Sequence, residues 1–254
     1  MPDSEFIFPF GAPLKPCPPH APKSSKLFVL GAYPSALHVR WDPPKPYDRI
    51  QALAVDNEPT PFWNGDGEEE LISAWMKEVN WRDTWGGISP AGRFNGSSGH
   101  WVDVNILNKF DVNRDNTWIT DCLDTYHLSS GVTGRLEDTY KAARKELDLS
   151  DWHLPPHPSE DRIVSYAVAD HAQRLRSEVE QASPEIIVTL GNAALRVLKE
   201  LFNTNISITK LSSVSAKYGQ SFEVRLTGKI AKWYPLAHPA APATYQVAHE
   251  KWMP

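Results

Sequence analysis

Residues 26–35 constrain the fold of this chain more than any other stretch. Residues 27–30 are four consecutive apolar residues, and the chain then breaks at Gly31 and again at Pro34. A short apolar run that ends in Gly and Pro is typical of a buried strand of a parallel sheet followed by a sharp turn. Ligands of open α/β sheets bind just beyond the carboxyl ends of such strands. The pattern therefore predicts a ligand site near Gly31, although an ordinary strand-to-loop exit has the same short pattern.

Apolar runs of strand length recur along the chain and alternate with segments of helical periodicity. This alternation predicts a three-layer α/β/α sandwich with a central, mostly parallel sheet. The further strands that we expect are residues 50–55, 117–123, 186–191, 206–211, 221–226 and 230–235. The helices that we expect are residues 68–79, 131–149, 161–181, 193–202 and 244–252.

The chain has 254 residues, which is within the range of one large domain. Residues 1–25 are rich in proline and cannot form a helix or a central strand. Phe6, Ile7, Phe8 and Phe10 give this segment apolar surface to bury, so we expect an arm that lies docked on the protein. Residues 26–254 are then expected to form a single domain.

Composition excludes several classes of protein. The net charge is −5 and the isoelectric point is about 6.0, so the chain as a whole has no basic surface for nucleic acid, although a local basic patch remains open. Two cysteines, Cys17 and Cys122, are too few for an iron-sulfur cluster or a disulfide framework. No apolar run approaches the length of a membrane span, and the N-terminus lacks a signal-peptide pattern. We expect no metal, no cofactor and no membrane partner.

Polar side chains follow three of the expected strands. Asp56, Asn57 and Glu58 follow residues 50–55, and either a plain turn or a carboxylate at the lip of a pocket would explain them. Asp121 lies near the exit of another strand. His238 follows the last strand and is fixed by the next residue, Pro239.

Three strand exits together point to a known family. They are Leu-Gly-Ala-Tyr-Pro-Ser at residues 30–35, Ile-Thr-Asp-Cys at 119–122 and Ala-His-Pro-Ala-Ala-Pro at 237–242. Their order and spacing resemble the uracil-DNA glycosylase superfamily, in which a strand followed by Gly-x-x-Pro comes first and His-Pro-Ser follows the final strand. The likeness covers nearly the whole chain from Lys26 onward.

The resemblance implies cleavage of an N-glycosidic bond, with His238 as a hydrogen-bond donor to the departing base. Gly31, Ala32, Tyr33 and Pro34 would then contact the substrate. Family members commonly have Asp, Asn or Glu within Gly-x-x-Pro, where this chain has Ala32 and Tyr33. We therefore expect the carboxylate that orients water and stabilises the sugar cation to come from Asp56, with Asn57 and Glu58 as alternatives.

The resemblance also places Asp121 at the base-reading position, where many members have Asn. An ionised Asp only accepts hydrogen bonds and would repel a carbonyl oxygen of uracil, so the base stays open, and Asp121 could instead be a buried structural acid. The loop after the His-Pro motif, which carries a DNA wedge in the family, has only Tyr245 as a long side chain.

The expected function is that of a DNA base-excision glycosylase, which removes a deaminated or damaged base, uracil or a related one, flipped from DNA. The alternatives are a glycosylase-fold protein without activity, which binds nucleic acid, a nucleotide or a protein partner, and an enzyme that cleaves free nucleosides. The expected partner is DNA that contains a modified base. We expect a monomer, associated with the cytoplasmic nucleoid in a bacterium or with the nucleus in a eukaryote.

Overall fold

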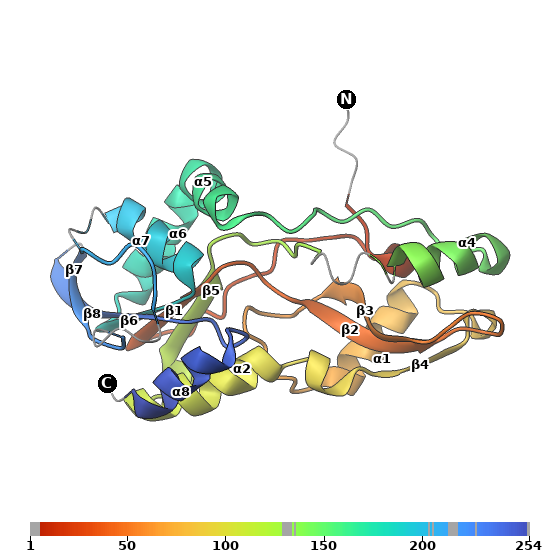
Figure 1. Ribbon diagram of the computed structural model, residues 1–254, viewed down its shortest axis with the longest axis horizontal. Helices are drawn as coiled ribbons and strands as arrows, with labels where there is room; N and C mark the ends of the chain where they lie inside the picture. Colours follow the sequence, from red (N-terminus) through yellow and green to blue (C-terminus); the bar gives the residue numbers. More distant parts are fainter. Residues whose placement is uncertain are drawn as a thin grey trace.

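Two sheets organise the molecule, one near each end of its long axis (Figure 1). The computed structural model describes residues 6–252 apart from 129–133, 135, 203, 205, 213–217 and 227. In the described part of the chain, no helix has both the length and the apolar character needed to cross a membrane.

The larger sheet has five strands in the order β5-β1-β6-β8-β7. Four of them are parallel, and only the edge strand β7 runs antiparallel to its neighbour. This mostly parallel sheet confirms the predicted fold class. The strands are β1 (Leu27–Gly31), β5 (Thr117–Asp121), β6 (Ile186–Leu190), β7 (Phe222–Leu226) and β8 (Lys229–Leu236).

Helices cover both faces of this sheet, as Figure 1 shows. Phe28 and Leu30 of β1 pack in one apolar cluster with α5 (Glu160–Asp170), α6 (Ala172–Ala182) and α7 (Asn192–Phe202). Leu27 and Val29 point to the opposite face because side chains alternate along a strand. They pack with the helical segment formed by α2 (Ser97–Val102) and η4 (Asp103–Leu107), and α8 (Ala243–Lys251) lies beside that segment. Every residue of β1 is buried, which explains its continuous apolar run.

The smaller sheet is antiparallel, in the order β3-β2-β4, and has an aromatic core of its own. Its strands are β2 (Ala36–Asp42), β3 (Ile50–Asn57) and β4 (Gly87–Pro90). The helices α1 (Glu68–Glu78) and α4 (Lys141–Leu147) pack beside it. The N-terminal arm joins this core, because Phe8 and Phe10 are buried in it and Ile7 pairs through its backbone with His153. The expected docking of the arm is thus seen from residue 6 onward.

Short helical turns complete the described chain, and one of them, η6, carries Arg114. They are η1 (Pro9–Gly11), η2 (Asp83–Trp85), η3 (Gly92–Phe94), η5 (Asn108–Phe110), η6 (Arg114–Asn116) and η7 (Leu136–Tyr140).

Three sequence predictions of secondary structure need correction. Residues 206–211 were expected as a strand but form none, because the carbonyls of Ile206 and Ile208 instead accept hydrogen bonds from Lys199. The single helix expected at 161–181 is divided at His171, whose backbone leaves the helical region. The strand expected at 50–55 exists as β3 but belongs to the smaller sheet. Part of the helix expected at 131–149 lies outside the described residues; the described part contains η7 and α4.

Candidate active site

A cavity of about 480 Å³ opens where the parallel strands end. Its lining comes from the exits of β1, β5, β6 and β8 and from the loop that follows β3. This is the edge at which ligands of open α/β sheets bind. The lining residues that carry the argument below are Tyr33, Glu58, Phe62, Asp121, His157 and His238.

Gly31 lies at the point where two of these side chains meet. A Cβ atom added at Gly31 would lie 2.1 Å from Oδ1 of Asp121 and 2.5 Å from the ring of Phe62. No side chain fits in that space, so only glycine allows the Asp121 carboxyl and the Phe62 ring to approach β1 this closely. Register places Gly31 directly beside Asp121 on the neighbouring strand. The ring of Phe62 and the carboxyl of Asp121 therefore converge on one spot.

His238 approaches the same spot from the end of β8, with its ring centroid 5.9 Å from that of Phe62. Its Nδ1 accepts a hydrogen bond of 3.1 Å from the backbone N–H of Ala240. Burial lowers the pKa of His238 to about 4, so the ring is neutral at neutral pH. Because Nδ1 is an acceptor, the single ring proton is on Nε2, and His238 offers one N–H donor.

Glu58 supplies a carboxylate to the cavity from the loop after β3. Its side chain is 6% exposed, and its Oε1 accepts a 2.8 Å hydrogen bond from the backbone N–H of Ser35. Burial raises the pKa of Glu58 to about 8, and the nearby charge of Asp121 adds to this. Backbone N–H groups of Ser35 and Phe62 and the charge of Arg114 oppose that rise, because they favour the ionised form.

Asp56 and Asn57, for which the sequence suggested a place at the site, lie outside the lining of the cavity. Oδ1 of Asp56 accepts hydrogen bonds from the backbone N–H and side-chain amide of Asn57, at 2.8 and 3.0 Å. Asn57 in turn binds the N-terminal arm, through the carbonyl of Pro13 and the N–H of Lys15. Neither side chain lines the cavity. Of these consecutive polar residues at the end of β3, Glu58, which directly follows the strand, is the one that lines the cavity.

Tyr33 forms one wall together with two histidines. Its hydroxyl lies 2.6 Å from Nδ1 of His157, and its ring meets the ring of His127 edge-on at 5.3 Å. Burial raises the pKa of Tyr33 and lowers that of His127. Tyr33 stands within Gly-x-x-Pro, where the resemblance would place Asp, Asn or Glu, and here it contributes a ring and a hydroxyl.

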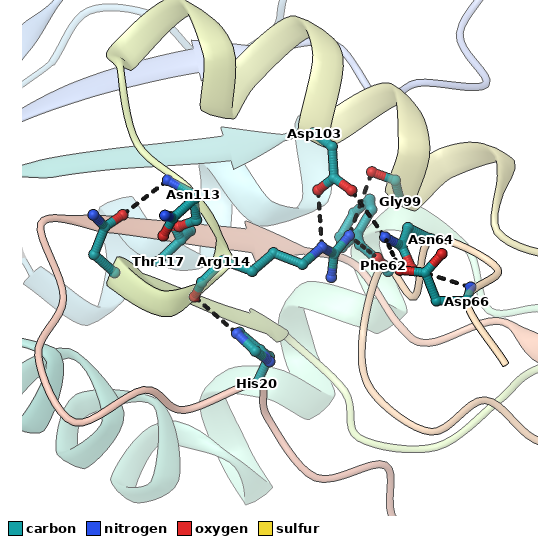
Figure 2. Close-up of polar contacts among 10 residues, drawn as sticks. His20, Phe62, Asn64, Asp66, Gly99, Asp103, Asn113, Arg114 and Thr117 are labelled. Carbon is teal, nitrogen blue, oxygen red and sulfur yellow. Dashed lines mark hydrogen bonds and ion pairs between the residues drawn. The ribbon is translucent and has the colours of Figure 1, made fainter.

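Arg114 binds the backbone of the loop that contains Phe62, here called the Phe62 loop (Figure 2). Its guanidinium donates to the carbonyl of Phe62 at 2.8 Å and to Oδ1 of Asp103 at 2.9 Å. The other carboxylate oxygen of Asp103 accepts a hydrogen bond from Asn64. Asp103 therefore connects to Phe62 through Arg114 and to Asn64 directly. Helix α2 also approaches closely, because a Cβ at Gly99 would lie 2.1 Å from the carbonyl of Phe62.

This support matters because Phe62 has an unusual backbone. Its φ angle is +52°, in the left-handed region that bulky side chains rarely adopt. Such a conformation persists only where the surrounding structure fixes it. The hydrogen bond from Arg114 to the Phe62 carbonyl is one of the contacts that hold this backbone in place.

The cavity gathers part of the residue set that the sequence singled out. Ala32, Tyr33, Pro34, Asp121 and His238 line it, and Gly31 lies directly beneath. Pro239 does not line it; its carbonyl accepts a hydrogen bond from Gln246. Tyr245, the long side chain of the loop after the His-Pro motif, donates a hydrogen bond from its hydroxyl to the carbonyl of Leu211.

Sequence reasoning missed the aromatic and imidazole part of the site. Phe62, Tyr126, His127 and His157 line the cavity and had not been singled out for it. Two prolines, Pro59 and Pro61, closely precede Phe62, which signals a fixed turn directly after β3, but nothing in the residue pattern gives the direction of the Phe62 ring. His157 lies in a proline-rich loop whose path depends on contacts distant in sequence. Among the described residues, neither Lys nor Arg lines the cavity.

Comparison with known proteins places the chain in a family. The family model described as "Uracil DNA glycosylase superfamily" matches residues 61–253, well over half of the chain. That match includes Phe62, Asp121 and His238 and begins after the Gly-x-x-Pro motif. No curated protein gives a significant match. Family model and fold agree with the resemblance that the strand exits suggested, and the chain belongs to the uracil-DNA glycosylase superfamily.

Proposed function

We propose that this protein is a DNA glycosylase that hydrolyses the N-glycosidic bond of a deaminated or damaged base flipped out of DNA. The observation that carries the proposal is the convergence of Phe62, Glu58 and His238 in one cavity. A base that enters such a cavity can stack on the Phe62 ring, which exposes its edge to Asp121.

Bond cleavage places negative charge on the departing base and positive charge on the sugar. The Nε2–H of His238 is a neutral donor that can stabilise the developing charge on a base oxygen. A neutral imidazole suits this task because it donates a hydrogen bond without having to give up its proton. It stays neutral because burial lowers the pKa of His238 to about 4.

Glu58 acts on the sugar side of the bond. When ionised, its carboxylate favours the positive charge that develops on the sugar and can orient the water that adds to the anomeric carbon. The hydrogen bond from Ser35 fixes the carboxylate before the substrate arrives. Asp56 suits this role less well, because its Oδ1 already accepts two hydrogen bonds from Asn57 and its side chain does not line the cavity. Our proposal therefore moves the function from Asp56 to Glu58.

The test uses oligonucleotides that carry a single uracil, hypoxanthine or xanthine, in single strands and in duplexes. After incubation with excess protein, hot alkali breaks the strand wherever a base has been removed. We expect breakage at one or more of these bases, and a large loss of it in His238→Ala. His153→Ala is the matched control, since His153 is exposed and lies on the arm side of the molecule.

Two outcomes would contradict the proposal. The first is no breakage at any of the three bases; tight, salt-sensitive binding without cleavage would then favour the non-catalytic DNA-binding alternative. The second is equal breakage by the wild type and His238→Ala. Release of free base from nucleosides but not from DNA would favour the nucleoside-cleaving alternative.

A further inference from the structure

Asp121 has an unusual environment for an acid. It is the last residue of β5, its side chain is 3% exposed, and it lines the cavity above Gly31. Its Oδ1 is buried and has no hydrogen-bond partner among the described residues. Buried polar groups nearly always have a partner, so an orphaned oxygen on a cavity wall points to a ligand.

The nearest cation does not neutralise this acid. Arg174 donates to the backbone carbonyls of Asp121 and Cys122, both at 2.9 Å, and to the side chains of Thr120 and Glu178. None of these hydrogen bonds reaches the Asp121 carboxyl. An ionised carboxylate that is buried without a bonded cation or donor is costly, and such a group takes up a proton instead.

Most of the described charged and titratable groups around Asp121 do not favour its ionised form. The charge of Glu178 on α6 opposes ionisation, whereas the charge of Arg174 favours it. Within the described part of the chain, Asp121 also influences the pKa of Glu58, Tyr33, Cys17 and Cys122, and none of these four is a cation. Burial raises the pKa of Asp121 to about 8, against the opposing charge of Arg174 and with a smaller contribution from Glu178.

Glu58 and Asp121 differ in what they can bind when ionised. The Glu58 carboxyl accepts hydrogen bonds from backbone N–H groups, and the positive charge of Arg114 favours its ionised form. Oδ1 of Asp121 accepts no hydrogen bond from the described residues. Two nearby buried carboxyls do not both ionise easily, and the one with donors keeps the charge. When one of the two carboxyls is ionised, the negative charge therefore belongs on Glu58, and the proton belongs on Asp121.

We propose that Asp121 reads the flipped base in its protonated form, with its O–H and C=O paired to the C=O and N–H of a lactam edge. Uracil, hypoxanthine and xanthine all carry such an edge. A neutral carboxylic acid offers one donor and one acceptor side by side, as the amide of Asn does. An ionised Asp121 has no donor and would repel the base carbonyl. The proposal rests on the proposed glycosylase function.

The pH dependence follows from the sign of this titration. Below its pKa, Asp121 keeps the proton that donates to the base carbonyl. As the pH rises through that pKa the donor is lost, so kcat/KM on a lactam base should fall about tenfold for each pH unit. Asp121→Asn keeps a donor and an acceptor at every pH, so it should cleave the same base without this loss.

The kinetic experiment compares the wild type, Asp121→Asn and Asp124→Asn on a uracil oligonucleotide between pH 6 and 9.5. Asp121→Asn also reports any loss that comes from titration of the uracil itself. Asp124→Asn removes a partly exposed acid three residues away and should keep the wild-type alkaline fall. An alkaline fall that persists unchanged in Asp121→Asn, or a folded Asp121→Asn that cleaves nothing at pH 7, would overturn the proposal.

A second measurement does not depend on activity. In protein labelled with ¹³C at the aspartate carboxyl, the resonance absent from Asp121→Asn belongs to Asp121. We expect that resonance to report a protonated carboxyl at pH 7 and to titrate near pH 8. A carboxylate signal already at pH 6.5 would overturn the proposal. If the wild type cleaves no base, the proposed function fails, while this titration still decides the protonation of Asp121.

Discussion

Glu58 and Asp56 lie two residues apart, yet only Glu58 lines the cavity. We predict that Glu58→Gln lowers the single-turnover rate of base removal by about two to three powers of ten, because the neutral amide cannot stabilise the sugar cation. Asp56→Asn serves as the matched control and should stay near the wild-type rate. Quenched-flow assays with excess protein measure both. A comparable loss in Asp56→Asn and none in Glu58→Gln would return the role to Asp56.

His238 acts as a neutral donor in the proposed reaction, which fixes its pH behaviour. Burial lowers its pKa to about 4, so His238 gains a proton only as the pH falls toward that value. We predict that His238→Ala lowers the single-turnover rate by about two to three powers of ten. The size of the loss should be constant from pH 6 to 8, because His238 does not titrate there. A ratio of rates that changes steeply around pH 6.5 would show that the charged imidazole is the active form.

Part of this site could be predicted from the sequence at the residue scale. Tyr33 and His238 each follow a strand of one parallel sheet and Asp121 ends another, and the carboxyl ends of such strands meet at one edge. Phe62 could not be predicted in the same way. Its position depends on a left-handed backbone and on Arg114, which is distant in sequence, and no local pattern encodes either.

The Phe62 loop is the element on which substrate stacking depends, and Arg114 positions it through the carbonyl of Phe62. We predict that Arg114→Met lowers kcat/KM by between about tenfold and a hundredfold, since small displacements of a positioned group cost that much. Arg114→Lys should recover part of the loss. Arg82→Met is the control, because Arg82 is exposed and forms its ion pair with Asp148 at the surface.

A double-mutant cycle separates positioning from a merely structural effect. If Arg114 acts through Phe62, Arg114→Met should cost little more once Phe62 is already Ala. Single-turnover kinetics of the two single variants and the double variant provide the comparison. Losses that simply add would mean that Arg114 acts independently of the Phe62 ring.

At the scale of elements, apolar periodicity identified the main strands but not all their partners. The strand predicted at residues 50–55 is confirmed as β3, yet a run of that length does not reveal which sheet it joins. The break between α5 and α6 was missed because His171 carries no Gly or Pro signal. Residues 206–211 have strand-like composition, but Lys199 binds carbonyls there that a strand would need for pairing. Tertiary contacts thus outweighed local preference.

For the whole molecule, the family match begins at residue 61, so the arm, β1, β2 and β3 lie before it. Yet β1 is a central strand of the larger sheet, and the turn after it lines the cavity. The smaller sheet connects that turn to Glu58, because β2 and β3 run between them in the chain. The monomeric state and the location of the protein in the cell stay predictions.

The N-terminal arm anchors the aromatic core beside the smaller sheet through Phe10. Its ring centroid lies between 5.0 and 5.7 Å from those of five other aromatic residues, and its side chain is 2% exposed. Its backbone N–H also donates to the hydroxyl of Tyr140 at 2.7 Å. A side chain enclosed this fully leaves a cavity when it is truncated, because rigid rings cannot collapse into the space. Phe10 therefore connects the arm to the stability of the folded protein.

We predict that Phe10→Ala lowers the free energy of unfolding by about 3–5 kcal/mol. Phe6→Ala on the same arm should cost under about 1 kcal/mol, because Phe6 is 38% exposed and contacts mainly the ring of His153. Urea titration followed by tryptophan fluorescence measures both, since four of the rings around Phe10 belong to Trp41, Trp75, Trp81 and Trp85. Equal effects of the two substitutions would show that the arm contributes no specific packing. Because Phe10 does not line the cavity, the rate of base removal per folded molecule should stay near that of the wild type.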